Sequence, residues 1–496
     1  MYKILLTLLV ICLTVNAQPS IEIQNAEIPL LINKDTNAIT AIKVGANQRI
    51  KSIEIELDEH CLDQIIEVSI LNNSQKFRPH WRPHLYKTTD KVRKVIKFKN
   101  GWNVKSSHEY FWISLKVKGD TSLLSKFGAR FKSVTFAKGG KVELNEPMVF
   151  QRTGINVRDT NDDKVKGYRI PGIVTTKKGT LLSVYDTRYN SARDLQGHMD
   201  IGLSRSTDGG QTWEKMKQII DMGTWGGLPE KFNGVSDACI LVDDKTNDIY
   251  VAGLWMHGII DRNGKWIEGL NEKSGLWTHQ WYNKASYKGF SPKETCQFMM
   301  VKSTDDGKTW SKPMNLTKML KKKEWYLLAP APGRGITLKD GTLVMPTQGR
   351  DAKGHPFSNF IYSKDSGKTW QTSNFAKSNT TECQIVQLDD NSLMLNMRDN
   401  RNYHPNKNFP ESGRSVCVTK DLGKTWVEHP TSRKALPEPV CCAGLHKHTF
   451  KKKLKGIPKT ILIFSNPPNK NKKGGRNKMT IKISLDNGKT WPEKYH

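Results

Sequence analysis

The sequence predicts an all-β protein in which a β-sandwich precedes a six-bladed β-propeller whose last blade is incomplete. Two observations predict this fold. An octapeptide of the pattern S/T-x-D-x-G-x-T-W occurs five times in the second part of the chain, and each copy follows a short strand-like run. The first part contains no octapeptide but has alternating runs such as 52–57 and 110–118, which are typical of a sandwich.

Each octapeptide is predicted to form a hairpin corner. Its aspartate can accept hydrogen bonds from the backbone amides of a tight turn, and its glycine tolerates a positive φ. The tryptophan that ends each copy can pack between sheets as a large apolar wedge. The five aspartates are Asp208, Asp305, Asp365, Asp421 and Asp486, and the five tryptophans are Trp213, Trp310, Trp370, Trp426 and Trp491.

The spacing of these corners indicates a propeller. Successive aspartates are about 55 to 65 residues apart, except for a first gap of about 97, and this period fits one four-stranded blade per repeat. Five corners therefore predict six blades, one of which lacks the signature. The long first gap holds an aromatic-rich insertion at about 258–290, which either lines a binding site by stacking or is a surface excursion with its own small core.

The N-terminus predicts export. Lys3 precedes an apolar run at 4–15, and Ala17 ends a small-residue cleavage site, which together are typical of a signal peptide. The apolar run is too short to span a bilayer, so we expect a periplasmic or extracellular protein with no membrane span. The predicted domains are a signal peptide at 1–17, a sandwich at 18–147 and a propeller at 148–496.

Composition excludes some classes of protein and leaves others open. The formal net charge is +30, but the lysines are scattered through turns and form no basic helix or nucleic-acid module, so we expect no nucleic-acid partner. A basic surface also attracts anionic sugars. The seven cysteines that follow the predicted signal peptide are expected to be buried free thiols, and no pair has the spacing of a zinc site. We expect a monomer without a metal.

Family resemblance becomes specific at Tyr168-Arg169-Ile170-Pro171, which resembles the arginine motif that opens the propeller of sialidases. The octapeptide is similar to the Asp box of the same proteins. The chain thus resembles bacterial exo-α-sialidases (neuraminidases) of glycoside hydrolase family 33, over about 148–496. Its N-terminal domain is similar to those of Bacteroidetes-type sialidases, for which carbohydrate binding has been proposed, so we expect a carbohydrate-binding domain or a domain with a packing or spacer role.

The chemistry of the expected substrate explains the arginines. A sialic acid carries a carboxylate on its anomeric carbon, and arginine offers planar, bidentate donors to a carboxylate. The resemblance implies that Arg169, Arg398 and Arg476, which come from different blades, bind this carboxylate together. Arg414, at the start of the strand before the fourth octapeptide, is interpreted as structural.

Further site residues follow from the same resemblance. Asp194 matches the general acid/base and Arg188 a substrate-binding arginine, although an Arg-Asp pair by itself is more often a surface salt bridge. Glu382 matches the glutamate that activates a tyrosine nucleophile. Asp237 and Gln348 are expected to line the sugar pocket, with a turn cap as the alternative for each.

The nucleophile itself is not assigned. A neutral tyrosine suits this reaction because an anionic nucleophile would be repelled by the substrate carboxylate. In the family this tyrosine follows the third arginine by some tens of residues, in a Gly-Tyr-Ser-like strand. The sequence ends at His496, and Tyr495 lies in the strand leaving the fifth corner, which is a different setting. We therefore expect a fragment, or a truncated and impaired product.

Three functional hypotheses remain open. The first is a retaining exo-α-sialidase that acts on sialylated glycoproteins, glycolipids or oligosaccharides without metal or organic cofactor. The second is a non-catalytic sialoglycan-binding propeller, or a truncated inactive sialidase. The third and weaker hypothesis is a nucleic-acid binder, on the basis of charge.

Overall fold

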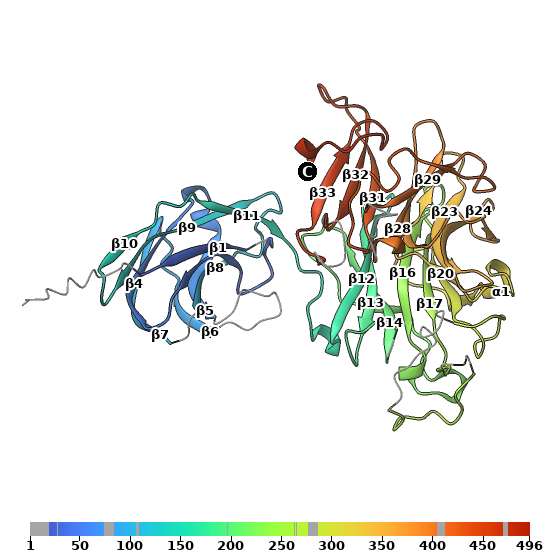
Figure 1. Ribbon diagram of the computed structural model, residues 1–496, viewed down its shortest axis with the longest axis horizontal. Coiled ribbons are helices and arrows are strands. Elements are labelled where there is room, and N and C mark those ends of the chain that lie inside the picture. Colours follow the sequence, from blue (N-terminus) through green and yellow to red (C-terminus); the bar gives the residue numbers. More distant parts are fainter. Residues whose placement is uncertain are drawn as a thin grey trace, which may run out of the picture. The chain divides into compact units, whose positions relative to one another are not determined.

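The computed structural model describes most of the chain and divides it into two compact units, Met1–Asn156 and Val157–His496 (Figure 1). The described residues are 19–26, 28–73, 84–105, 109–195, 197–261, 263, 265–275, 286–403, 412–469 and 475–496. The predicted signal peptide lies outside them. No helix in this described part is long and apolar enough to cross a membrane.

The first unit is a β-sandwich, as the alternating runs predicted. One sheet has the order β1-β3-β8-β5-β6, and the other has the order β2-β11-β9-β4-β7 with β10 beside β9. The strands are β1 (Ile21–Asn25), β2 (Leu30–Leu31), β3 (Ala38–Val44), β4 (Gln48–Leu57), β5 (Ile65–Asn73), β6 (His84–Thr89), β7 (Val95–Val104), β8 (Glu109–Val117), β9 (Lys126–Phe136), β10 (Lys141–Glu143) and β11 (Val149–Gly154). One apolar core joins the sheets, with Ile53 and Val134 from one and Phe111 from the other fully buried.

The second unit is built of five sheets in the part that the structure describes, all antiparallel except for the parallel pair of β16 and β21. They have the orders β12-β13-β14-β15, β19-β18-β17-β16-β21, β20-β23-β24-β25 with β22 and β26 at its margins, β27-β28-β29-β30, and β31-β32-β33. The strands of the first two sheets are β12 (Gly167–Thr175), β13 (Leu181–Arg188), β14 (Met199–Ser206), β15 (Lys217–Ile220), β16 (Val235–Val242), β17 (Ile249–Trp255), β18 (Gln297–Ser303), β19 (Met314–Asn315) and β21 (Gly333–Arg334).

The remaining three sheets continue the pattern, and the last has three strands. Their strands are β20 (Leu327–Pro330), β22 (Ile336–Thr337), β23 (Leu343–Arg350), β24 (Pro356–Ser363), β25 (Gln371–Thr372), β26 (Lys377–Ser378), β27 (Thr380–Gln387), β28 (Leu393–Asp399), β29 (Ser415–Thr419), β30 (Val427–Glu428), β31 (Gly444–Thr449), β32 (Thr460–Asn466) and β33 (Thr480–Ser484). The sixth blade expected from the sequence is not among the described residues, and the number of blades stays a prediction.

Short helical turns connect these strands. They are η1 (Glu59–Gln64), η2 (Asp162–Lys164), η3 (Trp225–Gly227), η4 (Glu230–Phe232), α1 (Thr317–Leu320), η5 (Asn400–Tyr403) and η7 (Glu493–Tyr495). Successive sheets are held together by separate apolar layers. Val184 and Ile240 meet between the first and second sheets, and Phe298 meets Phe357 between the second and third. The arrangement is that of a β-propeller, whose blades pack face to face.

The octapeptides form the corners between the third and fourth strands of four sheets and follow β33 in the fifth. At the second corner, Asp305 accepts hydrogen bonds from the backbone amide of Thr309 at 2.8 Å and from its hydroxyl at 2.6 Å. The amide of Gly307, at φ 77°, donates to Ser303 Oγ at 3.0 Å. Of the corner tryptophans, Trp370 and Trp491 are buried in the apolar layers between sheets.

The described part of the insertion has a small core. Ile259 and Leu270 pack with Phe232, and Trp266 stacks on His257 with their ring centroids 5.2 Å apart. Three aromatic residues of this insertion lie outside the described residues, namely Trp277, Trp281 and Tyr282. The packing therefore accounts for the described part without a ligand.

The corners should make stability depend on acid pH. The hydrogen bonds that Asp305 accepts from the Thr309 hydroxyl and amide lower its pKa from 3.8 to about 2. A carboxyl with a lowered pKa stabilises the fold above its unfolded pKa, and this contribution is lost as the pH falls through the folded value. Asp305→Asn should therefore lower the melting temperature by a few degrees at pH 7, and its difference from the parent should close between about pH 4 and pH 2.

Circular dichroism melts over pH 2 to 7 measure this difference. The matched control is Asp63→Asn, which changes an exposed aspartate of the first unit. If the difference in melting temperature between Asp305→Asn and the parent stays constant down to pH 2, the Asp305 carboxylate does not act through its ionised form.

Candidate active site

The first strands of three sheets, β12, β16 and β27, have an irregular ladder at the position of a predicted site residue. The ladder between β12 and β13 is interrupted between Arg169 and Gly172, and the ladder between β16 and β17 between Ser236 and Cys239. The ladder between β27 and β28 is interrupted between Thr380 and Cys383, which brackets Glu382. A bulge bends its strand and re-aims the side chains there. The same device therefore orients residues on three separate sheets.

Two of these bulges hold a strained backbone. Ile170 has φ 57° and Asp237 has φ 61°, both in the left-handed region. This region is unfavourable for a β-branched residue such as isoleucine and costs of order 1–3 kcal/mol. Such strain persists only where the surrounding sheet fixes the conformation, and it is concentrated at functional sites.

The first cluster joins Arg169, Arg188 and Asp194. Oδ1 of Asp194 accepts from Arg169 Nη1 at 2.9 Å and from Arg188 Nη1 at 2.7 Å. The Arg188 side chain is only 1% exposed, whereas Asp194 is 60% and Arg169 40% exposed. The Asp194 carboxylate thus lies at the solvent-exposed side of the site and is held by the buried guanidinium of Arg188.

Opposing effects set the pKa of Asp194. Burial raises it, but the hydrogen bond from Arg188 and the positive charges of Arg169, Arg188 and Arg476 more than offset this effect and bring it below its usual value. Asp194 is therefore ionised at neutral pH.

The loop that carries Asp194 is fastened at its base. The ring of His198 stacks on Tyr189 with centroids 4.2 Å apart, and its two nitrogens lie 3.2 Å from carboxylate oxygens of Asp200 and Glu230. Burial alone would lower the pKa of His198, but the hydrogen bond and charge of Asp200 and the charge of Glu230 raise it overall. The two ends of the loop are thereby held together.

A second cluster lies behind the first. The fully buried Asp186 accepts from Arg188 Nη2 at 2.7 Å and from the backbone amide of Asp237 at 3.0 Å. Gln348, on β23, donates to Asp237 Oδ2 at 3.2 Å. Burial raises the pKa of Asp237 well above its ordinary value, and the nearby Asp186, Glu382 and Asp194 raise it further. Asp237 is thus a carboxyl group that favours its protonated form.

The third cluster pairs Glu382 with Arg398. Arg398 Nη1 donates to Glu382 Oε2 at 2.5 Å, and Arg398 Nη2 donates to the Tyr403 hydroxyl at 2.8 Å. Burial would lower the pKa of Arg398, but Glu382 and Tyr403 raise it overall. The pair lies on adjacent strands, β27 and β28, so the sheet itself fixes its geometry.

Arg476 completes the set. Its Nη2 donates to the backbone carbonyl of Val440 at 2.8 Å, and its charge acts on Asp194. The negative charges of Asp194 and Glu382 both raise the pKa of Asp237, so the clusters from different sheets share one electrostatic environment. All eight predicted site residues are thus joined by contacts or by electrostatic coupling.

No group of histidine, cysteine, aspartate and glutamate side chains in the described ranges could hold a metal ion. The cysteines show no disulfide among these residues, and burial raises the pKa of the Cys383 and Cys442 thiols.

Comparisons with known proteins show the family of this chain. The BNR repeat-like domain family matches residues 170–494. The solved structure titled Hadza microbial sialidase Hz136 is similar with a TM-score of 0.81 and 37% identity, over 95% of this chain and 91% of that one. A sialidase of Bacteroides fragilis is 41% identical over 97% of this chain and 88% of its own length. The chain belongs to the sialidase family.

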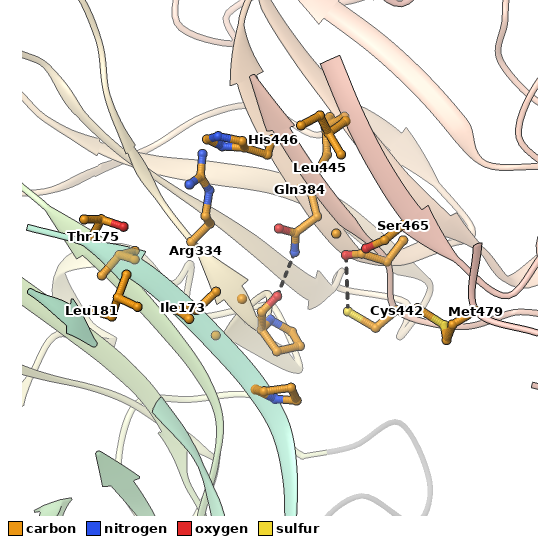
Figure 2. A pocket seen from close by; sticks show the side chains of 18 residues that line it. Ile173, Thr175, Leu181, Arg334, Gln384, Cys442, Leu445, His446, Ser465 and Met479 are labelled. Atoms are coloured by element: carbon orange, nitrogen blue, oxygen red, sulfur yellow. Dashed lines mark hydrogen bonds between the residues drawn. The ribbon is translucent and has the colours of Figure 1, made fainter. Parts of the chain in front are cut away.

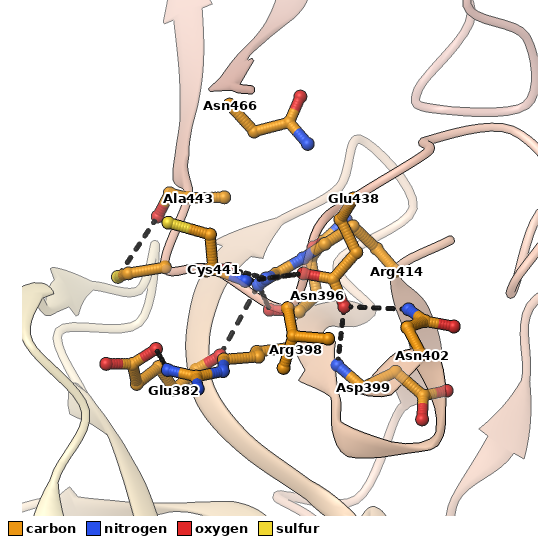
Figure 3. Close-up of polar contacts among 12 residues, drawn as sticks. Glu382, Asn396, Arg398, Asp399, Asn402, Arg414, Glu438, Cys441, Ala443 and Asn466 are labelled. Carbon is orange, nitrogen blue, oxygen red and sulfur yellow. Dashed lines mark hydrogen bonds and ion pairs between the residues drawn. The ribbon is translucent and has the colours of Figure 1, made fainter. Parts of the chain in front are cut away.

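A buried ion pair supports the third cluster of this sialidase (Figure 3). Arg414 donates through Nη1 to Glu438 at 3.1 Å and to the Cys441 carbonyl at 2.8 Å, and through Nη2 to the Glu382 carbonyl at 3.4 Å. Glu438 also accepts from the Asp399 amide at 2.7 Å. The pair therefore ties the strands of Glu382 and Arg398 to the loop 437–443, whose Val440 binds Arg476.

Sequence reasoning missed several residues that contact the candidate site. Asp186 lies two positions before Arg188, and this spacing along a strand places both side chains on one face, which was a usable signal. Glu438 follows no recognisable pattern and reaches Arg414 only through a loop. Tyr403 contacts Arg398 because η5 reverses the direction of the chain, and no local sequence pattern predicted this turn. Arg414 was interpreted as structural, and its contacts agree.

Removing Glu438 should destabilise the second unit strongly. Arg414 and Glu438 are both fully buried, and burial raises the pKa of Glu438 despite the charge of Arg414. Glu438→Ala leaves an uncompensated buried guanidinium, so we expect a loss of about 3–5 kcal/mol in the free energy of unfolding. Urea denaturation followed by tryptophan fluorescence measures this loss.

The double variant Arg414→Met/Glu438→Leu is the matched control, because it removes both charges and leaves neither unpaired. It should recover most of the lost stability while reducing activity, since Glu382 and Val440 lose their common support. A double variant as unstable as the single one would contradict the unpaired-charge explanation.

Proposed function

We propose that this chain is an exo-α-sialidase that hydrolyses terminal sialic acid from glycoproteins, glycolipids or oligosaccharides with retention. The observation that carries the proposal is the shared environment of Arg169, Arg398 and Arg476 with the carboxylates Asp194 and Glu382. Three guanidinium groups beside a solvent-exposed acid match a sugar whose anomeric carbon bears a carboxylate. The N-terminal segment supports an exported, periplasmic or extracellular enzyme.

The arginines would bind the substrate carboxylate. Arg169 and Arg476 contribute exposed guanidinium groups at the mouth of the site, and Arg398 contributes one from the side of Glu382. Each is held by a protein partner, which limits the rotamer freedom lost on binding. Arg188 would act indirectly, because its side chain is buried and bonded to both Asp186 and Asp194.

Asp194 would be the general acid and then the general base. In the free protein it is ionised, because Arg169, Arg188 and Arg476 stabilise its charge. A substrate carboxylate bound to Arg169 and Arg476 neutralises part of that positive field and raises the pKa of Asp194. The substrate itself would therefore favour protonation of the group that donates to the leaving oxygen.

Glu382 and Asp237 would take the other roles. Retention needs a nucleophile on the face of the sugar opposite Asp194, and Glu382 would accept the proton of that group. Asp237, with its raised pKa, would present a neutral carboxyl to the sugar without repelling the substrate carboxylate. Gln348 would fix its orientation.

Binding of sialoglycans without turnover is the second candidate. The arginines recognise the carboxylate whether or not a nucleophile is present, and no residue of the described part is assigned as the nucleophile. The two candidates differ in the release of sialic acid, which decides between them.

Turnover of a fluorogenic α-sialoside by the chain 1–496 tests the proposal. We expect release of free sialic acid, first as the α-anomer by proton NMR, and near-complete loss of turnover in Asp194→Asn. Saturable binding of α-methyl sialoside by calorimetry without any turnover would favour the binding protein. Neither binding nor turnover would overturn both candidates.

Arg169→Lys should weaken catalysis by on the order of 100-fold in kcat/KM. A lysine keeps the charge but cannot make a planar bidentate contact, and a hydrogen bond between charged groups contributes about 1.5–3 kcal/mol. The control is Arg193→Lys, which alters an exposed arginine next to Asp194. Equal losses in the two variants would show that the effect is one of local charge.

Binding of α-methyl sialoside should be coupled to proton uptake. The ligand raises the pKa of Asp194 from its lowered value in the free protein. At pH values between these two pKa values, the complex therefore binds more protons than the free protein. Calorimetry at pH 5 in buffers of different ionisation enthalpy measures this uptake, which Asp194→Asn should abolish. Uptake unchanged in that variant would assign the proton to another group.

A further inference from the structure

His198 lies between two carboxylates that come from different elements of the second unit. Its Nε2 is 3.2 Å from Oδ2 of Asp200, on β14, and its Nδ1 is 3.2 Å from Oε2 of Glu230, on η4. An ionised carboxylate only accepts hydrogen bonds, whereas a neutral imidazole has one donor and one acceptor nitrogen. With both carboxylates ionised, the two contacts are favourable together only when the ring carries two N–H groups, as the imidazolium does.

Uncharged neighbours hold the ring of His198 in this orientation. Tyr189 stacks on the ring with centroids 4.2 Å apart, and Gln218 Nε2 donates to the Tyr189 hydroxyl at 2.7 Å. The backbone amide of Tyr189 donates to the His198 carbonyl at 3.1 Å, and the His198 amide donates to Asn190 Oδ1 at 2.8 Å. The ring therefore loses the stack if it turns away from either carboxylate.

Three carboxylates lie near the ring, and their charges raise its pKa. Burial alone would lower the pKa of His198, but the hydrogen bond and charge of Asp200 and the charges of Glu230 and Asp221 raise it above 6.5. Burial also raises the pKa of Asp200, with a further contribution from the charge of Asp221. The proton between His198 and Asp200 is therefore held more firmly than the proton of an exposed histidine.

The charged neighbours of His198 all belong to the first two sheets of the second unit, on β14 and on the connection from β15 to β16. The cavity in Figure 2 lies elsewhere, between the first and the last described sheet, and neither His198 nor its partners line it. The environment of His198 is therefore set by the same two sheets that carry Asp194 and Asp237.

The segment that carries Glu230 is braced by its own hydrogen bonds. The buried Asn233 donates through Nδ2 to the Trp225 carbonyl at 3.1 Å, and its amide donates to the Glu230 carbonyl at 2.8 Å. The contact between Glu230 and His198 therefore joins the loop of Asp194 to a separately fixed part of the second sheet.

The position of Asp194 depends on how this loop is fastened. Asp194 lies four residues before His198 in the loop between β13 and β14, and 60% of its side chain is exposed. The end of the loop packs closely on the start of β16, because a Cβ at Gly234 would come within 3.1 Å of the Gly197 carbonyl oxygen. A misplacement of about 1 Å in a reacting group can cost on the order of 100-fold in rate.

We propose that His198, in its imidazolium form, is a positioning residue that fastens the loop of Asp194 between Asp200 and Glu230. His198, Asp200 and Glu230 are called the histidine clamp below. This inference rests on the proposed function, because its consequence is a dependence of sialoside turnover on the charge of His198. A group with a raised pKa contributes fully at low pH, so the clamp is complete below pH 6.5 and is lost as the pH rises through the pKa of His198.

The ratio of kcat/KM between the parent and His198→Gln, followed from about pH 5 to pH 9, tests the clamp. Asp194 is present in both proteins, so its own titration cancels in the ratio. We expect the parent to be about tenfold more active near pH 5, mainly in kcat, and the ratio to approach one at pH 9, where the parent has lost the imidazolium. A ratio that does not change with pH would show a purely structural role and overturn the proposal.

The matched control for this comparison is His60→Gln, which makes the same substitution at an exposed histidine of the first unit. It should follow the pH profile of the parent throughout. Near-ultraviolet circular dichroism verifies that both variants are folded.

Glu230→Gln keeps the proposal testable if His198→Gln fails to fold. A glutamine amide can donate to one nitrogen of the neutral imidazole while the other nitrogen donates to Asp200, so both contacts persist without the additional proton. We therefore expect kcat/KM to decline less steeply with rising pH in this variant than in the parent. An equal decline in both would overturn the clamp. The matched control is Glu272→Gln, which removes the same charge from an exposed position and should keep the decline of the parent.

An NMR titration separates failure of this inference from failure of the proposed function. The imidazole signal of His198 is the one that disappears in His198→Gln, and its pKa is measured without substrate. We expect a pKa above 6.5 in the parent and a value lower by about one unit or more in Glu230→Gln. A pKa at or below 6.5 in the parent, or equal values in both proteins, overturns the clamp whether or not sialoside is hydrolysed. Both expected pKa values without any turnover would contradict the proposed function and leave the fastening of the loop intact.

Discussion

The β-bulges in the first strands are the constraint on which the candidate site depends. In a regular strand, each side chain points to one face of its sheet. Arg169, Asp237 and Glu382 would then point into the apolar layers between sheets. The bulge at each position re-aims the side chain at the cost of a locally broken ladder. Sheets far apart in sequence therefore present polar groups to one region.

The charged groups in that region are stabilised by one another. Three carboxyl groups would repel one another if all were ionised, and the raised pKa of Asp237 relieves part of this repulsion. Asp194 and Glu382 remain paired with arginines from their own or the neighbouring strand. The excess of guanidinium over carboxylate is the feature that distinguishes this site from a set of structural ion pairs.

Rigidity of the scaffold maintains this balance. The strained residues Ile170 and Asp237 keep positive φ values only because the flanking strands are locked into two neighbouring sheets. The corners and the apolar layers provide that locking, and the buried pair of Arg414 and Glu438 extends it to the loop of Val440.

The sequence by itself determined the repeated unit and the identity of the main polar residues. The octapeptides are local signals, because each turn is closed by an aspartate and a threonine four positions apart, and the motif at Arg169 is equally local. The same holds for the alternation that predicted the sandwich. The family, and with it the expectation that Asp194 and Glu382 are site residues, followed from such short motifs.

Only the tertiary structure decided which of these residues meet and what supports them. Tyr403 and Glu438 reach their partners through turns, and such contacts leave no periodic trace in the chain. The direction of each pKa shift was also undecided, because it depends on burial and on charges from other blades. The same residue type, arginine, is a buried anchor at position 188 and a half-exposed group at position 169, and only the surrounding sheets make that difference.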